Sequence, residues 1–246
     1  MTLAVACVCG WLAASANAFV YWSNFAGSSV GRAGLDGGGA SESFVASPHA
    51  TAGVAVDAHF VYWADNAAGT IGRANLDGSG ANPNFITGLS EPSGVAVDSG
   101  HIYWTNEGTN SIGRANLDGT VVTPTFIINA SGPEGIAVNA TNIYWANNTT
   151  GAIGRATLAG AVTSQNFITG LNGPNGVAVD SGHIYWADFG NGSIGRANLD
   201  GTAVSDDLVG ALNQPSAVAV DAGHVYWTSF GDNAIGRANL DGSAPV

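Results

Sequence analysis

A unit of 41 residues is repeated six times along this 246-residue chain, with no insertion or deletion between the copies. A Tyr-Trp pair marks each unit, and the pairs begin at Tyr21, Tyr62, Tyr103, Tyr144, Tyr185 and Tyr226. A Gly-Arg dipeptide keeps the same spacing, with its arginine at Arg32, Arg73, Arg114, Arg155, Arg196 and Arg237. A third phrase, Gly-Val-Ala-Val-Asp, begins at Gly53, Gly94 and Gly176, and variants of it begin at Gly135 and Ala217. A period near 40 residues is typical of repeat architectures, in which each unit buries its apolar surface against its neighbours.

Each unit contains four short segments of strand-like composition, separated by glycine, proline and asparagine. In one full copy these segments are roughly 53–57, 60–65, 70–76 and 84–87. The links between them are short enough to force antiparallel neighbours. In the turns at 98–101 and 221–224 we expect Gly100 and Gly223 to supply a positive φ.

The Tyr-Trp pair decides between the possible all-β architectures. Consecutive strand residues point to opposite faces, so Tyr62 lies on one face of its sheet and Trp63 on the other. A sandwich buries only one face of each sheet, whereas a propeller blade is packed between two other blades. The sequence therefore predicts an all-β fold, a six-bladed β-propeller with four antiparallel strands per blade.

The charge balance excludes some partners. The chain has no lysine, and its 18 acidic residues give a net charge of -12. The chain lacks a basic surface that could bind the phosphates of a nucleic acid. We therefore expect neither nucleic acid binding nor stable insertion into a membrane. All six arginines stand at the same position of the repeat, which we call the arginine column. We interpret them as structural, each held against an aromatic face or a carboxylate.

The repeated phrases resemble the YWTD repeats of low-density lipoprotein receptor class B, which form six-bladed propellers. The resemblance is carried by residues 94–98, 102–106 and 112–119 and by their copies over residues 19–246. The fourth motif position is aspartate only at Asp65 and Asp188, and no cysteine-rich module follows the propeller. The resemblance implies a protein-binding propeller in a secreted or extracytoplasmic setting, although a fold alone does not fix an activity.

The first 18 residues allow several interpretations. The outermost strand carries Phe44, Phe85, Phe126, Phe167 and Leu208, and a sixth copy would fall at position 249. Residues 2–6 could supply that missing outer strand of the last blade and make a single domain with 19–246. Alternatively, residues 1–18 are a signal peptide that ends at Ala16-Asn17-Ala18, or the product of a truncated gene start. The two cysteines, Cys7 and Cys9, both lie in this segment and say little about the redox compartment.

Metal and catalytic motifs are weak in this sequence. His101, His183 and His224 share a turn column, which spreads them around the rim and away from a common zinc ion, and His49 and His59 have no obvious partner. An aspartate column could form a partial calcium ring at one channel mouth, but we prefer to interpret each member as the cap of its own turn: Asp57, Asp98, Asp180 and Asp221. Ser93 and Ser216 lack a histidine and carboxylate that the sequence could place beside them. We identify no catalytic residue and expect no cofactor, with Ca²⁺ as a possibility.

Differences between blades should carry any specificity. Loops that enter the innermost strand and loops between the second and third strands lie on one face of a propeller. The blade-specific residues in these loops are candidate ligand-binding residues: Glu107, Glu134, Asn148, Asn175, Asp188, Phe189, Phe230 and Asp232. Aromatic rings beside acids and amides suit a peptide or a polar ligand. The sequence favours a monomeric, non-catalytic protein-binding or scaffold module, with a propeller hydrolase or lyase that holds a metal in its channel as the alternative, and a rigid spacer within a larger protein as a third.

Overall fold

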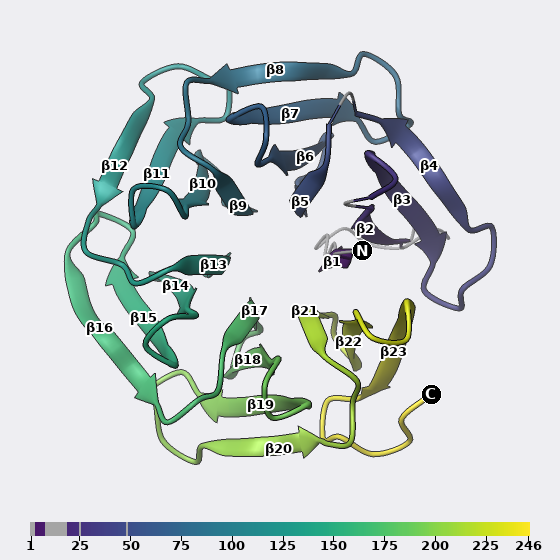
Figure 1. The fold of residues 1–246 in the computed structure, drawn as a ribbon, viewed down its shortest axis with the longest axis vertical. Helices are drawn as coiled ribbons and strands as arrows, with labels where there is room; N and C mark the ends of the chain where they lie inside the picture. Colours follow the sequence, from purple (N-terminus) through teal and green to yellow (C-terminus); the bar gives the residue numbers. More distant parts are fainter. Residues whose placement is uncertain (1–2, 8–18, 25, 48) are drawn as a thin grey trace.

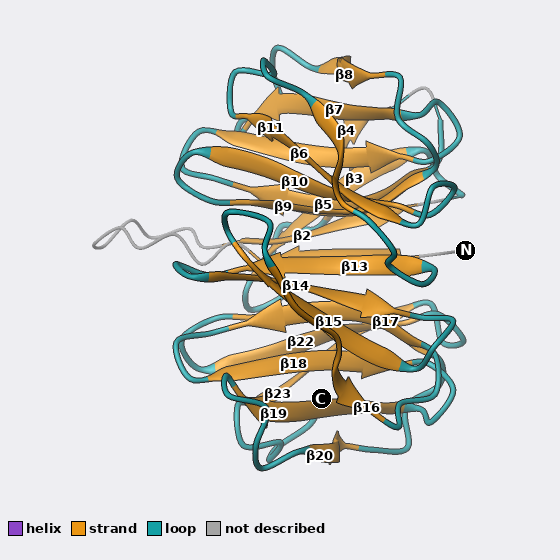
Figure 2. Ribbon diagram, turned by 90° about the vertical axis from the view of Figure 1, so that its left-hand side faces the viewer, coloured by secondary structure: helices purple, strands orange, loops and turns teal. Residues whose placement is uncertain are grey.

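The computed structural model describes residues 3–7, 19–24, 26–47 and 49–246, which form strands and loops. Figure 1 shows six sheets arranged around a central axis, and Figure 2 shows the loops gathered at both ends of the strands. None of the described residues forms a helix that is long and apolar enough to cross a membrane. The all-β six-bladed propeller is therefore confirmed.

Each strand takes one of four positions from the axis outward. The innermost strands are β1 (Leu3–Cys7), β5 (Thr51–Val56), β9 (Pro92–Val97), β13 (Pro133–Val138), β17 (Pro174–Val179) and β21 (Pro215–Val220). The second strands, which carry the Tyr-Trp pairs, are β2 (Phe19–Asn24), β6 (Phe60–Asp65), β10 (His101–Asn106), β14 (Asn142–Asn147), β18 (His183–Asp188) and β22 (His224–Ser229). The third strands carry the arginines and are β3 (Ser29–Gly34), β7 (Thr70–Asn75), β11 (Ser111–Asn116), β15 (Ala152–Thr157), β19 (Ser193–Asn198) and β23 (Ala234–Asn239). The outer strands are β4 (Ser41–Ala46), β8 (Asn82–Thr87), β12 (Thr123–Ile127), β16 (Val162–Thr169) and β20 (Ser205–Val209).

All pairings within a blade are antiparallel between strands consecutive in sequence. Five sheets have four strands, and the last has three within the described residues, β21-β22-β23. Each blade thus forms from one local stretch of chain, as short links require. Contacts between blades come from packed side chains, from side chains that bind a carbonyl of the next blade, and from the close approach of the innermost strands.

The hydrophobic core lies between blades, in six clusters that each join a tyrosine of one blade to a tryptophan of the next. Tyr62 packs with Trp104, for example, and Tyr226 packs with Trp22 across the seam between the last and first blades. Tyr62 and Trp104 are both fully buried. The opposite orientation of the two aromatic residues therefore holds the ring of blades together.

The arginine column has a structural role, as the sequence predicts. Arg73 Nη1 donates to the carbonyl of Leu117 in the following blade at 3.1 Å. The Arg73 guanidinium also lies 4.2 Å from the ring centroid of Phe60 and 3.8 Å from that of Phe85. The same bond to a leucine carbonyl 44 residues ahead recurs from Arg32, Arg114, Arg155 and Arg196. Each arginine thus binds the next blade, and Arg32, Arg73, Arg114 and Arg155 also stack on an aromatic ring of their own blade.

Strand β1 does not lie where the repeat arithmetic placed it. Leu3 to Cys7 pair with Asn24 to Val20, so β1 is the innermost strand of the first blade and not the outer strand of the last. Without β1, the inner edge of β2 would leave backbone N–H and C=O groups unpaired at the crowded axis, which is costly. The proposed cleavage site at 16–18 and Cys9 lie outside the described residues.

The expected positive φ at Gly100 and Gly223 is also wrong, because neither glycine adopts a left-handed conformation. The aspartate side chain shapes these turns instead. Asp98 Oδ1 accepts the backbone N–H groups of Gly100 and His101, each at 2.7 Å. Side chains stand at the Gly100 position in other blades, namely His59 and Thr141.

Candidate functional site

A cavity of about 350 Å³ opens at one mouth of the central channel, where the chain enters the innermost strands. Two columns of the repeat surround it. The residue just before the conserved glycine contributes Ala52, Ser93, Glu134, Asn175 and Ser216. The first residue after the second strand contributes Phe189 and Phe230. Serine occurs twice at the first position and phenylalanine twice at the second, but the alanine, the glutamate and the asparagine occur once each, so the mouth is chemically asymmetric on a symmetric scaffold.

Close approach of the innermost strands shapes the floor of this cavity. A Cβ atom added to Gly53 would lie 2.6 Å from the carbonyl oxygen of Ser93, and one added to Gly94 would lie 2.5 Å from that of Glu134. Real side chains do not come this close to a backbone oxygen. Glycine at this column therefore lets neighbouring blades meet, and the preceding residue is held at the mouth.

Glu134 is the acidic group of the cavity, and it is partly buried. Ser93 Oγ donates to its Oε2 at 2.6 Å. Burial raises the pKa of the Glu134 carboxyl to about 6. The hydrogen bond from Ser93 opposes this rise, and the negative charge of Glu107 adds to it. Thr105 fixes the backbone here, because its hydroxyl accepts from the N–H of Gly94 and donates to the C=O of Glu134, both at 2.6 Å.

The other side of the mouth is aromatic. The ring centroids of Phe189 and Phe230 are 6.4 Å apart, with the planes tilted by 48°. Asn148 Nδ2 donates to Asn175 Oδ1 at 2.6 Å between the acidic and aromatic sides. The arrangement can receive a ligand that has a hydrogen-bond donor or positive charge at one end and an apolar group at the other.

The predicted site residues divide into two groups. Four of them line the cavity, namely Glu134, Asn175, Phe189 and Phe230, while Asn148 supports Asn175 and Glu107 lies exposed beside Glu134. The remaining two have hydrogen-bond partners outside the cavity lining. Asp188 is fully buried and accepts the backbone N–H groups of Asn172 and Asn191, and Asp232 accepts a bond from Asn213 at 2.8 Å.

Sequence reasoning considered two of the lining residues only as nucleophiles. Ser93 and Ser216 line the cavity from the same column as Glu134. Their position in the repeat could have identified them as lining residues. The residue before the glycine that begins the Gly-Val-Ala-Val phrase varies between blades, while the glycine itself is nearly constant. No histidine joins the Ser93–Glu134 pair among the hydrogen bonds of the described residues.

The aspartate column does not form a metal ring. Asp98 Oδ2 accepts the Tyr103 hydroxyl at 2.9 Å while its Oδ1 caps the turn, and Asp57, Asp180 and Asp221 repeat both contacts. Within the described part of the chain, no three His, Cys, Asp or Glu side chains are grouped so that they could hold a metal ion. The turn-capping interpretation therefore accounts for these carboxylates.

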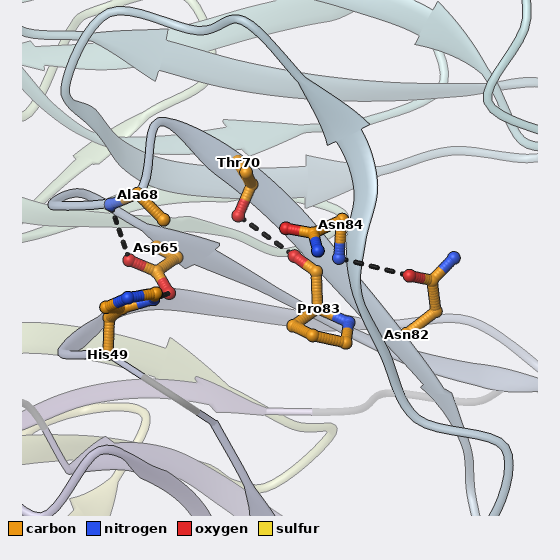
Figure 3. A network of polar contacts seen from close by, with 7 residues as sticks. All are labelled: His49, Asp65, Ala68, Thr70, Asn82, Pro83 and Asn84. Carbon is orange, nitrogen blue, oxygen red and sulfur yellow. Dashed lines mark hydrogen bonds and ion pairs between the residues drawn. The ribbon is translucent and has the colours of Figure 1, made fainter.

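The histidines lie apart from the mouth cavity. His101, His183 and His224 each place Nδ1 at 3.5–3.7 Å from the aspartate of their own turn. His49 has a partner that the sequence did not suggest, because its Nδ1 lies 3.1 Å from Oδ2 of the buried Asp65 (Figure 3). Asp65 also accepts the N–H of Ala68 at 2.9 Å, so it ties two loops together.

Comparison with solved structures shows the same fold in proteins of different activity. The chain is similar to one in a nidogen/laminin complex, with 24% identity, a TM-score of 0.77, and 93% of this chain and 91% of that chain covered. A catalytically inactive histidine-to-alanine variant of virginiamycin B lyase from Staphylococcus aureus, with quinupristin, gives 22% identity, a TM-score of 0.70 and coverage of 92% and 78%. A gluconolactonase from Xanthomonas campestris gives 19%, 0.72, and 87% and 80%.

Comparison with curated proteins gives no match. The sequence model of the virginiamycin B lyase family, in contrast, matches residues 7–245. That span includes all six Tyr-Trp pairs and every residue that lines the mouth cavity. The chain therefore belongs to the virginiamycin B lyase family.

Proposed function

We propose that this propeller is a non-catalytic binding module whose mouth cavity takes a peptide that carries a cationic group next to an aromatic side chain. The observation behind this proposal is the division of the cavity into an acidic side at Glu134 and an aromatic side at Phe189 and Phe230. A buried carboxylate favours a cation that replaces its lost solvation, and the rings supply apolar area.

The resemblance to YWTD repeats supports a protein or peptide as the ligand. The similar chain in the nidogen/laminin complex belongs to a protein assembly, which fits the same class of function. The net charge of -12 would also attract a basic partner over the whole surface. We further propose that the module acts as a monomer in a secreted or extracytoplasmic setting.

Calorimetric titration with capped dipeptides tests the binding proposal. Acetyl-Phe-Lys-amide should bind more tightly than acetyl-Phe-Glu-amide and acetyl-Ala-Lys-amide, because only the first matches both sides of the cavity. E134Q and F189A should each weaken binding about tenfold, the loss expected for one good contact of about 1.4 kcal/mol. S181A, an exposed change in a turn between β17 and β18, is the control. Equal affinity for the three dipeptides would refute the proposal.

A lyase is the second candidate, since the chain belongs to a family named for that activity. A metal-dependent lyase needs at least three side chains that converge on one ion. The described residues contain no such group of His, Cys, Asp or Glu. Quinupristin incubated with the purified chain and a divalent metal ion should stay intact by chromatography if the binding proposal holds. Loss of intact quinupristin that a chelator stops would favour the lyase instead.

A further inference from the structure

The fifth blade lacks a polar contact that joins the second strand to the outer strand in other blades. In the third blade, Asn106 Nδ2 donates to the carbonyl oxygen of Pro124 at 2.8 Å. The same bond recurs at 2.6 Å from Asn24 to Glu42 and from Asn147 to Gln165. The equivalent pair in the fifth blade is Asp188 and Asp206. Because a carboxylate has no N–H group, the carbonyl oxygen of Asp206 loses this donor.

A buried hydroxyl beside this pair has no hydrogen-bond partner. Ser193 lies opposite Asp188 in the register of β18 and β19, so the two side chains share a face of the sheet. In the first blade the equivalent hydroxyl, Ser29 Oγ, donates to the carbonyl oxygen of Glu42 at 2.8 Å. The same position directs Ser193 Oγ toward the carbonyl of Asp206. Ser193 is only 3% exposed, and its Oγ is left unpaired by the described residues. Such a group is costly to bury and points to a ligand.

The two carboxylates accept hydrogen bonds only from neutral donors in the described part of the chain. Asp188 is fully buried and accepts the backbone N–H groups of Asn172 and Asn191 at 2.8 and 3.0 Å. Asp206 is half-buried, and its Oδ1 accepts the indole N–H of Trp186 at 2.9 Å. Asn191 Nδ2 lies between the carboxylates, 2.7 Å from Asp206 and 3.2 Å from Asp188. Two negative charges are therefore held together without a counter-charge, which favours uptake of a cation.

The second blade also has an aspartate at this position, but it supplies a different partner. Asp65 Oδ2 lies 3.1 Å from the imidazole Nδ1 of His49 (Figure 3). In the fifth blade Asn172 takes the place of His49, and Asp206 takes the place of Pro83. The fifth blade thus loses a group that can carry positive charge and gains a second carboxylate.

We infer that the fifth blade binds Ca²⁺ between the carboxylates of Asp188 and Asp206, with Ser193 Oγ and the Asp206 carbonyl oxygen as further ligands. Carboxylate and neutral oxygens are the ligands that this hard cation takes. The ion replaces the donor that an asparagine supplies in other blades, and it balances the two charges. The site has two carboxylates, and neutral oxygens complete it, so it differs from a cluster of three acidic or imidazole side chains. It ties the turn after β18 to the outer strand β20.

Terbium luminescence tests this site, because Tb³⁺ takes the same oxygen ligands as Ca²⁺ and emits when a nearby indole is excited. Trp186 donates directly to Asp206, so its ring lies beside the proposed ion. Tb³⁺ should bind the full chain saturably. Ca²⁺ should displace it more effectively than Mg²⁺, which demands a tighter octahedral geometry.

Matched aspartate variants assign the site. D188N should weaken Tb³⁺ binding about tenfold or more, because it removes a ligand charge. It should still fold, since it restores the amide of the other blades, and a thermal melt without metal checks this. D206N should weaken binding as well. D65N is the equivalent change in the second blade and should leave binding unchanged. Ca²⁺ should raise the melting temperature of the unaltered chain and not that of D188N.

The inference fails if the Tb³⁺ emission does not saturate, if D188N binds Tb³⁺ as well as the unaltered chain, or if D65N weakens binding as much as D188N. One further outcome also overturns it. If D188N melts at a higher temperature and the unaltered chain binds no Tb³⁺, a proton on Asp188 takes the part assigned to the cation.

Discussion

Arg237 Nη1 donates to the carbonyl oxygen of Leu35 at 3.0 Å, across 202 residues of sequence. The same bond joins Arg114 to Leu158 at 3.1 Å across 44 residues. The contact that links consecutive blades therefore also links the last blade to the first. Closure of this propeller uses an ordinary blade interface, supplemented by β1 at the axis.

R237M should lower the free energy of unfolding by about 1–3 kcal/mol, because it removes a charged donor from a carbonyl at the seam. Urea unfolding measures the loss. R114M is the matched change at an internal interface and should cost a similar amount. Hydrogen exchange should then speed up mainly in the first and last blades for R237M, and in the third and fourth for R114M. Identical exchange patterns would contradict this assignment.

G94A should destabilise the chain by about 1–3 kcal/mol, since its Cβ atom would press on the carbonyl of Glu134 and force the blades apart. G182A should stay within about 0.5 kcal/mol. The nearest atom to a Cβ at Gly182 is Asp180 Oδ1 at 3.8 Å, and its φ is not left-handed. Thermal melts of the two variants side by side decide the matter, and equal losses would count against the close-approach explanation.

Glu134 should make stability depend on pH in a defined window. Its folded pKa of about 6 lies above its ordinary value of 4.5, so its protonated form stabilises the fold below pH 4.5. That contribution, at most about 2 kcal/mol, is lost as pH rises through 6. E134Q should remove this part of the pH dependence. Urea midpoints at pH 4.5 and 7.5 for both proteins give the difference, and parallel profiles would contradict the prediction.

Y103F should cost about 1–2 kcal/mol, because Asp98 Oδ2 loses the hydroxyl that donates to it at 2.9 Å. The fourth blade offers a matched control. Asn139 stands there in place of the aspartate, so the buried Tyr144 hydroxyl has no carboxylate to which it could donate. Y144F should therefore be neutral or slightly stabilising. Equal destabilisation of both variants in thermal melts would show that the Tyr–Asp bond contributes little.

The architecture could be predicted because it depends on short-range pattern. Alternating faces place Tyr62 and Trp63 in different interfaces, and short links oblige each blade to form from consecutive strands. The structural role of the arginines followed from their perfect repetition. Four of the eight candidate ligand-binding residues line the cavity, because loops of the same type meet at one end of every propeller.

The rest depends on contacts that no local pattern encodes. The place of β1 depends on its pairing with β2, which counting back along the repeat from Phe44 could not show. The bond from Ser93 to Glu134 spans two blades. His49 meets Asp65 only after the loop between the first two blades is folded. Asp188 resembles a surface acid in sequence, yet backbone N–H groups hold it inside.

The arginine of each unit donates to a leucine carbonyl of the next unit, and its own leucine carbonyl accepts from the arginine of the unit before it. Each blade interface is therefore of the head-to-tail kind found in cyclic oligomers. Such a contact produces an open filament unless the rotation per unit divides a full turn. The chain is in this sense a cyclic hexamer whose protomers are tethered by peptide bonds. Duplication or deletion of one unit would preserve every contact within the remaining blades and still require a new angle at all interfaces, which makes the number of units harder to change than any single residue.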